Sequence, residues 1–240
     1  MSYMFPSVRD GLYLKDDFLV DAAVATGTVG ELDWVMTTIA NASTAAYLVT
    51  TDTGPGVYGV LRDTTAATAN GDGEAYTLLA DTVVLGGNLP GFFRFRARLH
   101  DQIAGNYFRI GLDDSVTATD GTVGIWVASV AGVISLIAAS NDHGDVTAAA
   151  ANVATFTAGT TMVLDTWHEF EVRWSGNNVR GGPLQVVLYV DGHLAAEINN
   201  CEIDDDEEME PSIVHWNLSG GALAVELDVD YFELFISRSK

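Results

Sequence analysis

The histidines are the first side chains to consider for chemistry, because imidazole is a common catalytic base and metal ligand. The five histidines are spread along the sequence, with no close spacing typical of zinc ligands. None accompanies a recognisable nucleophile motif. We therefore predict neither a zinc site nor a catalytic triad, and we expect His168 in the core or at a strand end. The five are His100, His143, His168, His193 and His215.

A second candidate is the acidic run CEIDDDEEMEP at residues 201–211. Its carboxylates are the hard oxygen ligands that calcium prefers. The run lacks the spaced Asp-x-Asp-x-Asp-Gly pattern of a calcium loop, and consecutive acids repel one another. We expect a solvated loop, with a calcium site as the alternative. The acids are Asp204, Asp205, Asp206, Glu207, Glu208 and Glu210.

No cofactor is predicted. The segment GDGEAY at residues 71–76 contains glycines but lacks the lysine and hydroxyl partner of a phosphate-binding loop.

The charge of the chain argues against anionic partners. It has 33 acidic and 11 basic residues, a net charge of −22, and only Lys15 and Lys240 are lysines. Binding a phosphate backbone requires clustered Lys and Arg to release counterions. We therefore expect neither nucleic acid nor an anionic membrane as a partner. We interpret the charge as a means of solubility, with adaptation to a salty medium as the alternative.

The length of 240 residues fits one β domain with its own core, so neither disulfides nor a metal are needed for stability. The single cysteine, Cys201, has no partner within the chain. No apolar stretch approaches the ~18–20 residues of a membrane helix. The start, MSYMFPSVRDGLYLKDD, lacks a basic region followed by an apolar one. We expect synthesis in the cytoplasm without a signal peptide.

Alternating apolar residues predict the strands that must position any site. Segment 91–100 has a period of two, with arginines opposite its apolar face. Segment 106–114 repeats the pattern, with Tyr107 and Arg109 outward, and we expect a loop containing Gly105 to join the two as a hairpin. The inward residues are Phe93, Phe95, Ala97, Leu99, Phe108, Ile110 and Leu112.

Further strands follow. Residues 122–140 predict two strands around a turn at Ala131-Gly132. Residues 167–174 and 184–190 alternate, and the latter end in an Asp191-Gly192 turn typical of a hairpin. Between Tyr231 and Phe232 the apolar phase slips, which predicts a bulge or a strand covered on both sides.

Two segments are predicted outside this strand pattern. The Ala-rich stretch 147–154 is the one plausible short helix. Residues 1–14 lack periodicity and predict an N-terminal arm, which precedes a single domain over residues 15–240.

Four segments carry a resemblance. TWHEFEVRW followed by PLQVVLYVDG resembles the central signature of concanavalin A-like, laminin-G-like jelly rolls, in which Trp-His opens one strand and a later strand ends in a Tyr-Val-Asp-Gly turn. LDVDYFELFISR resembles the last strand of that superfamily. DDFLVDAAVATGTVGELDWV is similar to the opening segment of such domains in tailed-phage virion proteins. The resemblance implies an all-β, two-sheet antiparallel jelly-roll sandwich and a virion context.

Laminarinase-like members of that superfamily use a Glu-x-Asp-x-x-Glu motif. Here Glu31 and Asp33 are present, but Met36 stands where the second glutamate is required. Retaining hydrolysis needs two carboxylates about 5–5.5 Å apart, so half of the mechanism is missing. We expect solvated acids at a strand edge and no glycosidase.

The aromatic and basic residues leave alternatives open. Trp126 and Trp174 are expected in the core, whereas Trp34, Trp167 and Trp216 could lie at strand ends and stack on sugars. The stripe of three arginines either pairs with acids across strands, such as Glu169 and Glu171, or forms a subunit contact. The stripe is Arg94, Arg96 and Arg98.

The sequence thus predicts a non-enzymatic virion structural protein, a capsid decoration protein that docks on the particle surface and stabilises it. Its partners would be other virion proteins, the major capsid protein or tail components, and further copies of itself, with a trimer expected. It would reach the virion surface after synthesis in the host cytoplasm. The alternatives are a carbohydrate-binding module, a tail receptor-binding component and, more remotely, a glycoside hydrolase.

Overall fold

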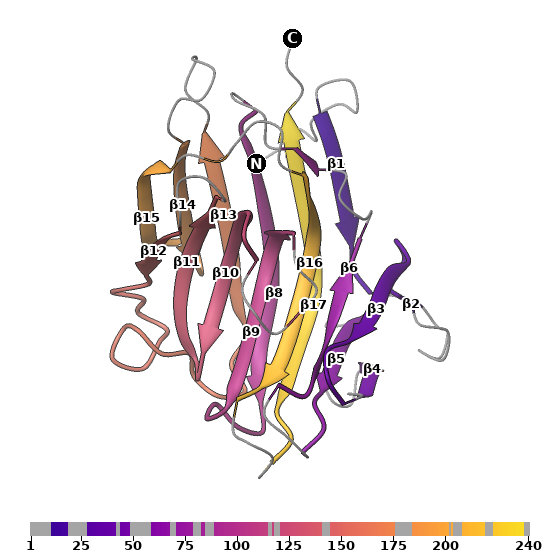
Figure 1. Cartoon of the computed structure of the whole chain (residues 1–240). Coiled ribbons are helices and arrows are strands. Elements are labelled where there is room, and N and C mark those ends of the chain that lie inside the picture. The colour runs from indigo at the N-terminus through magenta and orange to yellow at the C-terminus, as the bar shows by residue number, and fades with distance from the viewer. Residues whose placement is uncertain are drawn as a thin grey trace.

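The computed structural model of this chain is a sandwich of two antiparallel sheets, and the residues that it describes include no helix (Figure 1). The predicted all-β jelly-roll class is confirmed. Nothing in the described part of the chain is a helix long and apolar enough to cross a membrane. The residues described are 11–18, 28–41, 44–48, 59–67, 71–78, 83–84, 89–114, 117, 121–140, 145–175, 184–201, 203, 208–218 and 223–237.

The first sheet, sheet A, has the strand order β15-β14-β13-β8-β17-β5-β4, and β1 also pairs with β17. Its two longest strands, β8 (Gly91–His100) and β17 (Glu226–Ser237), lie side by side at its centre. The others are β1 (Gly11–Asp16), β4 (Thr44–Leu48), β5 (Val60–Thr64), β13 (His168–Ser175), β14 (Leu184–Val190) and β15 (His193–Cys201).

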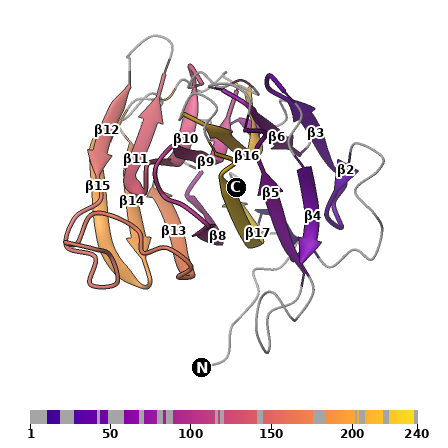
Figure 2. The ribbon, with the colours of Figure 1, turned by 90° about the horizontal axis from the view of Figure 1, so that it is seen from below.

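The second sheet, sheet B, has the strand order β12-β11-β10-β9-β16-β6-β3-β2, and β7 pairs with β16. Figure 2 shows the two sheets as facing layers. The strands are β2 (Thr28–Val29), β3 (Trp34–Thr38), β6 (Gly73–Thr77), β7 (Val83–Val84), β9 (Asn106–Asp113), β10 (Gly124–Val130), β11 (Val133–Ala139), β12 (Val146–Ala149) and β16 (Glu208–Asn217).

Aromatic rings from both sheets fill the space between them. Phe170 of sheet A lies 4.9 Å from Phe95 of the same sheet and 6.4 Å from Phe108 of sheet B, between ring centroids. Trp34 of sheet B meets Phe232 of sheet A edge to face at 5.3 Å. All five are fully buried. Such pairs add to the apolar area that they bury, so this layer is the main source of the stability of the sandwich.

Two predicted hairpins are confirmed, and each has a two-residue loop. β10 and β11 join through Ala131 and Gly132, with φ of 49° and 79°. β14 and β15 join through Asp191 and Gly192, with φ of 51° and 77°. Two successive positive φ angles are the geometry of a type I′ turn, whose twist matches that of the strands.

The predicted hairpin between residues 91–100 and 106–114 is wrong. β8 lies in sheet A and β9 lies in sheet B, so the segment with Gly105 crosses from one layer to the other. The predicted inward residues of both strands are nevertheless fully buried. Alternation identifies the buried face of a strand, but it does not say which sheet the strand joins.

Two further predictions need correction. Residues 147–154 form no helix, because Val146–Ala149 pair with β11 as an edge strand and this pairing outweighs the weak helix preference of alanine. Gly11–Leu14 of the predicted arm lie in β1, paired with β17, while residues 1–10 lie outside the described residues.

The predicted irregularity in the last strand is a bulge. The register between β17 and β8 shifts between Val229 and Tyr231, which leaves Asp230 as the extra residue. Val229 before the shift and Phe232 after it therefore both face the core.

A side-chain network joins the Trp-His segment to the Asp-Gly turn. One Asp191 oxygen accepts hydrogen bonds from His168 Nδ1 at 2.9 Å and from Thr155 Oγ1 at 2.5 Å. Its other oxygen accepts from the amide of Glu169 at 2.9 Å. Burial acts to raise the pKa of Asp191, but these hydrogen bonds outweigh it and hold the pKa below its usual value. The Asp-Gly turn is thereby fixed to the start of β13.

This network predicts a pH-dependent stability. Because the pKa of Asp191 is lowered on folding, its carboxylate stabilises the protein above the unfolded pKa of about 3.9, and the effect is lost as the pH falls through the folded value. Asp191→Asn should therefore lower the Tm at about pH 6, by an amount that shrinks below about pH 4. Thermal unfolding followed by circular dichroism measures this. Asp33→Asn, on an exposed turn, is the control, and a deficit in Asp191→Asn that is independent of pH would contradict the assignment.

Candidate binding face of sheet A

The outer face of sheet A is organised around the paired strands β8 and β17. Alternate residues of β8 point outward, and each contacts an outward residue of β17. Arg96 lies opposite Tyr231 in the register, but its side chain pairs with the bulge residue Asp230. We call these ten residues the β8–β17 seam. In order, its pairs are Phe92 with Phe235, Arg94 with Glu233, Arg96 with Asp230, Arg98 with Asp228, and His100 with Glu226.

The seam contains a buried carboxylate held by two arginines. Asp228 has no exposed surface, and its oxygens accept hydrogen bonds from Arg98 Nε at 2.6 Å and from Arg62 Nε and Nη2 at 2.6 and 2.8 Å. Charged hydrogen bonds of this kind are stronger than neutral ones. Removing one partner of a buried pair leaves an uncompensated charge, which typically costs about 3–5 kcal/mol.

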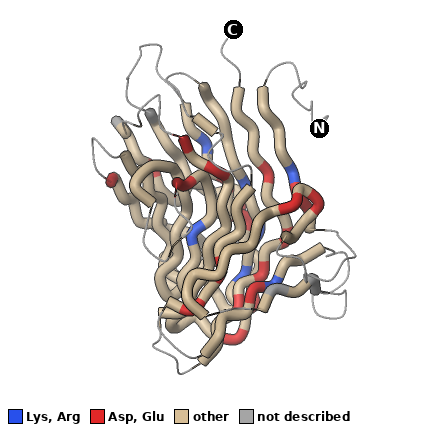
Figure 3. Tube along the Cα trace, turned by 45° about the vertical axis from the view of Figure 1, so that its right-hand side comes forward, with Lys and Arg blue, Asp and Glu red and all other residues tan. Residues whose placement is uncertain are grey.

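The arginine stripe is therefore used within the chain, and one of its two predicted roles is observed. The partners differ from those suggested by the sequence. Glu171 and Glu169 lie across from Arg94 and Arg96 on β13, but Glu171 pairs with Arg173, and Glu169 accepts a hydrogen bond from Tyr231. The arginines turn instead to acids of β17. Figure 3 shows the few basic residues set among acidic ones.

Aromatic rings cover part of the ion pairs of the β8–β17 seam. The guanidinium groups of Arg96 and Arg98 lie 5.0 and 4.9 Å from the Trp167 ring centroid, a cation–π arrangement. Burial raises the pKa of Tyr231, and its hydrogen bond to Glu169 adds to the effect. Burial also raises the pKa of Asp230, although Arg96 opposes it. The ion pairs of the seam are thus partly shielded from water.

An open groove of about 440 Å³ lies at the Phe92–Phe235 end of the seam. Its floor and walls come from β8, β13, β14 and β17. The two phenyl rings lie 5.8 Å apart, and the guanidinium of Arg173 lies 5.1 Å from the Tyr189 ring centroid. The residues that give the groove its chemistry are Phe92, Phe235, Tyr189, Trp174, Arg173 and Gln185.

The groove combines aromatic surface with a few oriented polar groups. Trp174 donates its indole N–H to the carbonyl of Leu89 at 2.8 Å, which fixes the ring in the wall. Gln185 also lines the groove, and it donates its amide to Glu197 at 2.6 Å and to Asn199 at 3.2 Å. Apolar lining with a small number of placed polar groups is typical of small-molecule sites.

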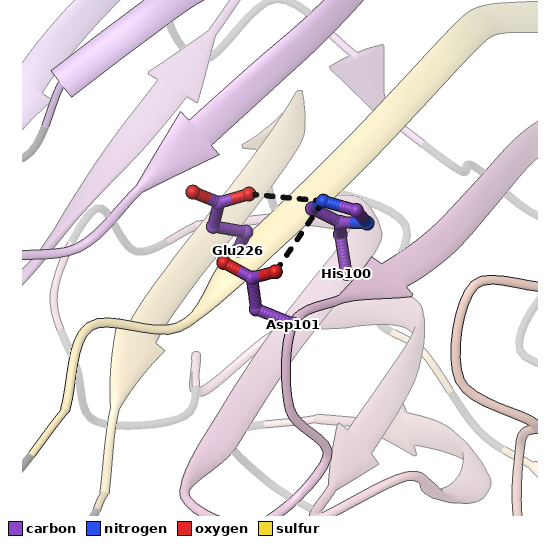
Figure 4. Close-up of side chains that lie close together, drawn as sticks. All are labelled: His100, Asp101 and Glu226. Atoms are coloured by element: carbon purple, nitrogen blue, oxygen red, sulfur yellow. Dashed lines mark ion pairs between the residues drawn. The ribbon is translucent and has the colours of Figure 1, made fainter. Parts of the chain in front are cut away.

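The opposite end of the seam holds a histidine among carboxylates (Figure 4). His100 Nε2 lies 3.4 Å from Asp101 Oδ1 and 3.8 Å from Glu226 Oε2, while Nδ1 contacts Asp165. Among the residues that the structure describes, His100, Asp101 and Glu226 are the one group of three able to share a metal ion. The sequence did not predict this cluster, because Glu226 reaches His100 only through the β8–β17 register.

The outer face of sheet B carries a different cluster. The rings of Tyr107 and Trp216 stack with centroids 3.5 Å apart, and Trp126 is fully buried near them in a small apolar group. Arg109 is also fully buried, pairs with Asp113, and donates to the carbonyl of Thr117 at 3.0 Å. Arg109 and Tyr107 face outward as predicted, but both are covered.

The carboxylates of the hydrolase motif lie apart from these sites. Glu31 and Asp33 are exposed in the turn before β3, and Met36 packs against the core. This arrangement agrees with solvated acids at a strand edge.

The tryptophans divide as follows. Trp174 and Trp126 are buried as predicted, although Trp126 lies outside the main core. Trp34 and Trp216 are buried at opposite ends of their strands. Trp167, directly before β13, is partly exposed, but the guanidinium groups of Arg96 and Arg98 lie over its ring. The partly exposed aromatic residues of the groove are Phe92, Tyr189 and Phe235, and Trp174 is buried in its wall.

Most of the other predicted candidates lie outside the sites described above. His168 is fully buried, as expected. His215 is fully buried and contacts Asp63 Oδ2 at 2.5 Å. Glu208 and Glu210 begin β16, with Glu210 buried. His193 is exposed. His143 and residues 204–207 of the acidic run lie outside the described residues.

Comparison with known proteins gives fold relatives only. No family model and no curated protein matches the chain. A protein of unknown function from Shewanella oneidensis MR-1 superposes with a TM-score of 0.62 at 12% identity, covering 96% of this chain and 90% of that one. The endo-beta-1,4-glucuronan lyase of the fungus Trichoderma reesei superposes with a TM-score of 0.57 at 12% identity, covering 94% of this chain and 95% of that one.

The botulinum neurotoxin serotype C1 binding domain gives 0.56 at 9% identity, covering 95% of this chain and 49% of that one, so this chain spans about half its length. At such low identities the likeness shows the fold alone. The resemblance to concanavalin A-like domains is thus supported as a jelly-roll-like sandwich, and the phage origin stays a prediction.

Proposed function

We propose that this protein is a non-enzymatic binding module that takes a neutral glycan in the groove on the outer face of sheet A. The observation that carries the proposal is the combination of Phe92, Phe235 and Tyr189 with the polar ends of Gln185 and Arg173 in one open groove of about 440 Å³. A pyranose has an apolar C–H face, which suits an aromatic ring, and a rim of hydroxyls, which suits amide and guanidinium groups.

The charges favour a neutral glycan over an acidic one. The only cation of the groove, among the described residues, is Arg173, and it is paired with Glu171. The net charge of −22 repels polyanions. Hydroxyl groups carry no such penalty and can accept hydrogen bonds from the guanidinium.

Two further points support a binding role without catalysis. The motif that resembles a hydrolase site has Met36 in place of its second carboxylate, and its remaining acids lie on a turn away from the groove. The fold neighbours include a botulinum neurotoxin binding domain, so a sandwich of this kind also occurs in a binding domain.

Binding to an array of neutral oligosaccharides, followed by calorimetry, tests the proposal. We expect saturable binding that Tyr189→Ala or Phe92→Ala weakens at least about tenfold, equivalent to about 1.4 kcal/mol. Val35→Ala, exposed on the outer face of sheet B, is the matched control and should bind like the wild type. No binding across the array, or equal binding by the Tyr189 variant, would reject this function.

The second candidate is a capsid decoration protein on the virion surface. The similarity of residues 16–35 to the opening segments of tailed-phage virion domains favours it. In this role the chain docks on the major capsid protein or tail components as a homo-oligomer, with a trimer expected. Many weak contacts with the lattice then stabilise the particle by mass action.

This candidate predicts a solution mass of three chains and binding of the purified protein to particles that lack it. Deleting residues 1–10, which precede β1, should reduce particle binding at least about tenfold while the Tm is retained. Sedimentation with particles and light scattering measure both properties. A monomer that does not sediment with any particle would exclude the role.

A further inference from the structure

We propose that His100, Asp101 and Glu226 form a binding site for one divalent transition-metal ion of the zinc class. The three residues come from the end of β8, the residue after it and the start of β17 (Figure 4). The site lies at the opposite end of the seam from the groove and is independent of the glycan proposal.

The spacing of the donor atoms fits such an ion. The nitrogen and the two carboxylate oxygens all lie within 4.8 Å of one another. Ligands bound at about 2.0–2.2 Å in a tetrahedral site lie roughly 3.3–3.6 Å apart. The 3.4 Å between His100 Nε2 and Asp101 Oδ1 already meets this spacing, and the 3.8 Å to Glu226 Oε2 requires only a small movement.

The orientation of the imidazole is the second, independent observation. Asp165 contacts Nδ1, so Nε2 is the ring nitrogen that faces Asp101 and Glu226. With the Nδ1–H donated to Asp165, Nε2 would be the atom that binds the ion. Histidine ligands of metal ions usually bind the ion through one ring nitrogen and donate a hydrogen bond from the second nitrogen to a carboxylate or carbonyl.

The surroundings allow an ion to enter. The His100, Asp101 and Glu226 side chains are 29%, 64% and 17% exposed, so water can complete the coordination. Arg62 contacts the cluster, and its Nη1 lies 3.1 Å from Glu226 Oε2. Its Nε and Nη2 are held by Asp228, so the metal must share Glu226 with a single guanidinium N–H.

The ligand set selects the class of metal. One imidazole nitrogen with two carboxylate oxygens suits Zn²⁺ and its neighbours in the first transition row. Calcium instead takes six to eight oxygen ligands, which this cluster does not supply. Occupancy would tie the end of β8 to the start of β17 and, through Asp165, to the loop before β13.

Calorimetric titration of the metal-free full chain with ZnCl₂ at neutral pH tests the proposal. We expect one ion per chain and a rise in Tm. His100→Gln and Glu226→Gln should each weaken binding by at least about a hundredfold, and Asp165→Asn by about 10–100-fold, because it removes the outer partner of the histidine. His193→Gln, an exposed histidine elsewhere, is the control and should leave binding unchanged.

Asp101→Asn, at the most exposed of the three ligands, provides a variant expected to fold if the others are unstable. Cobalt supplies a spectroscopic readout, because its visible absorption should show the loss of the nitrogen ligand in His100→Gln. The proposal is overturned if the wild type takes up no stoichiometric Zn²⁺. It is equally overturned if uptake persists unchanged in both His100→Gln and Glu226→Gln, which would place the ion elsewhere on the chain.

Discussion

The carboxylate of Asp228, enclosed between Arg62 and Arg98, is the interaction on which the outer face of sheet A depends. It ties together β5, β17 and β8, three neighbouring strands at the centre of the sheet. A fully buried charge is tolerated only where its hydrogen bonds are satisfied, and here two guanidinium groups satisfy it. With β8 and β17 fixed in this register, the outward residues at both of their ends are also fixed.

The seam neutralises basic residues within a strongly acidic chain. Three arginines on one strand of a protein with net charge −22 would be expected to be neutralised, and each is bound by an acid of β17. The result is an ordered face with little excess charge, which ends in an aromatic groove on one side and a histidine–carboxylate cluster on the other. An ordered, charge-balanced face can bind a neutral ligand or another protein without first rearranging its own ion pairs.

Side-chain alternation was sufficient to predict the buried faces of β8, β9 and β13 and an irregularity close to the bulge at Asp230, but it did not identify β12 or the residues of β1 within the predicted arm. It predicted the core positions of β8 and β9 correctly but assigned both to one hairpin, because a short loop can join strands of the same sheet or of opposing sheets. Likewise, the Tyr-Val-Asp-Gly turn was recognisable, whereas its physical basis, the bonds of Asp191 to His168 and Thr155, depends on a contact between distant segments.

The candidate sites were less predictable than the fold. Arg94 has an acid on either side, Glu171 on β13 and Glu233 on β17, and it pairs with Glu233 while Glu171 pairs with Arg173, a choice that the sequence does not reveal. The groove combines residues of four strands whose order within the sheet cannot be derived from local patterns.

A double-mutant cycle between Arg98 and Asp228 tests the central claim most directly. The free energy of unfolding is measured in urea for the wild type, Arg98→Met, Asp228→Asn and the double variant. If the buried pair organises the seam, the two substitutions are coupled by about 1.5 kcal/mol or more. Effects that add within about 0.5 kcal/mol would contradict this account, since they would show that the carboxylate and the guanidinium contribute independently.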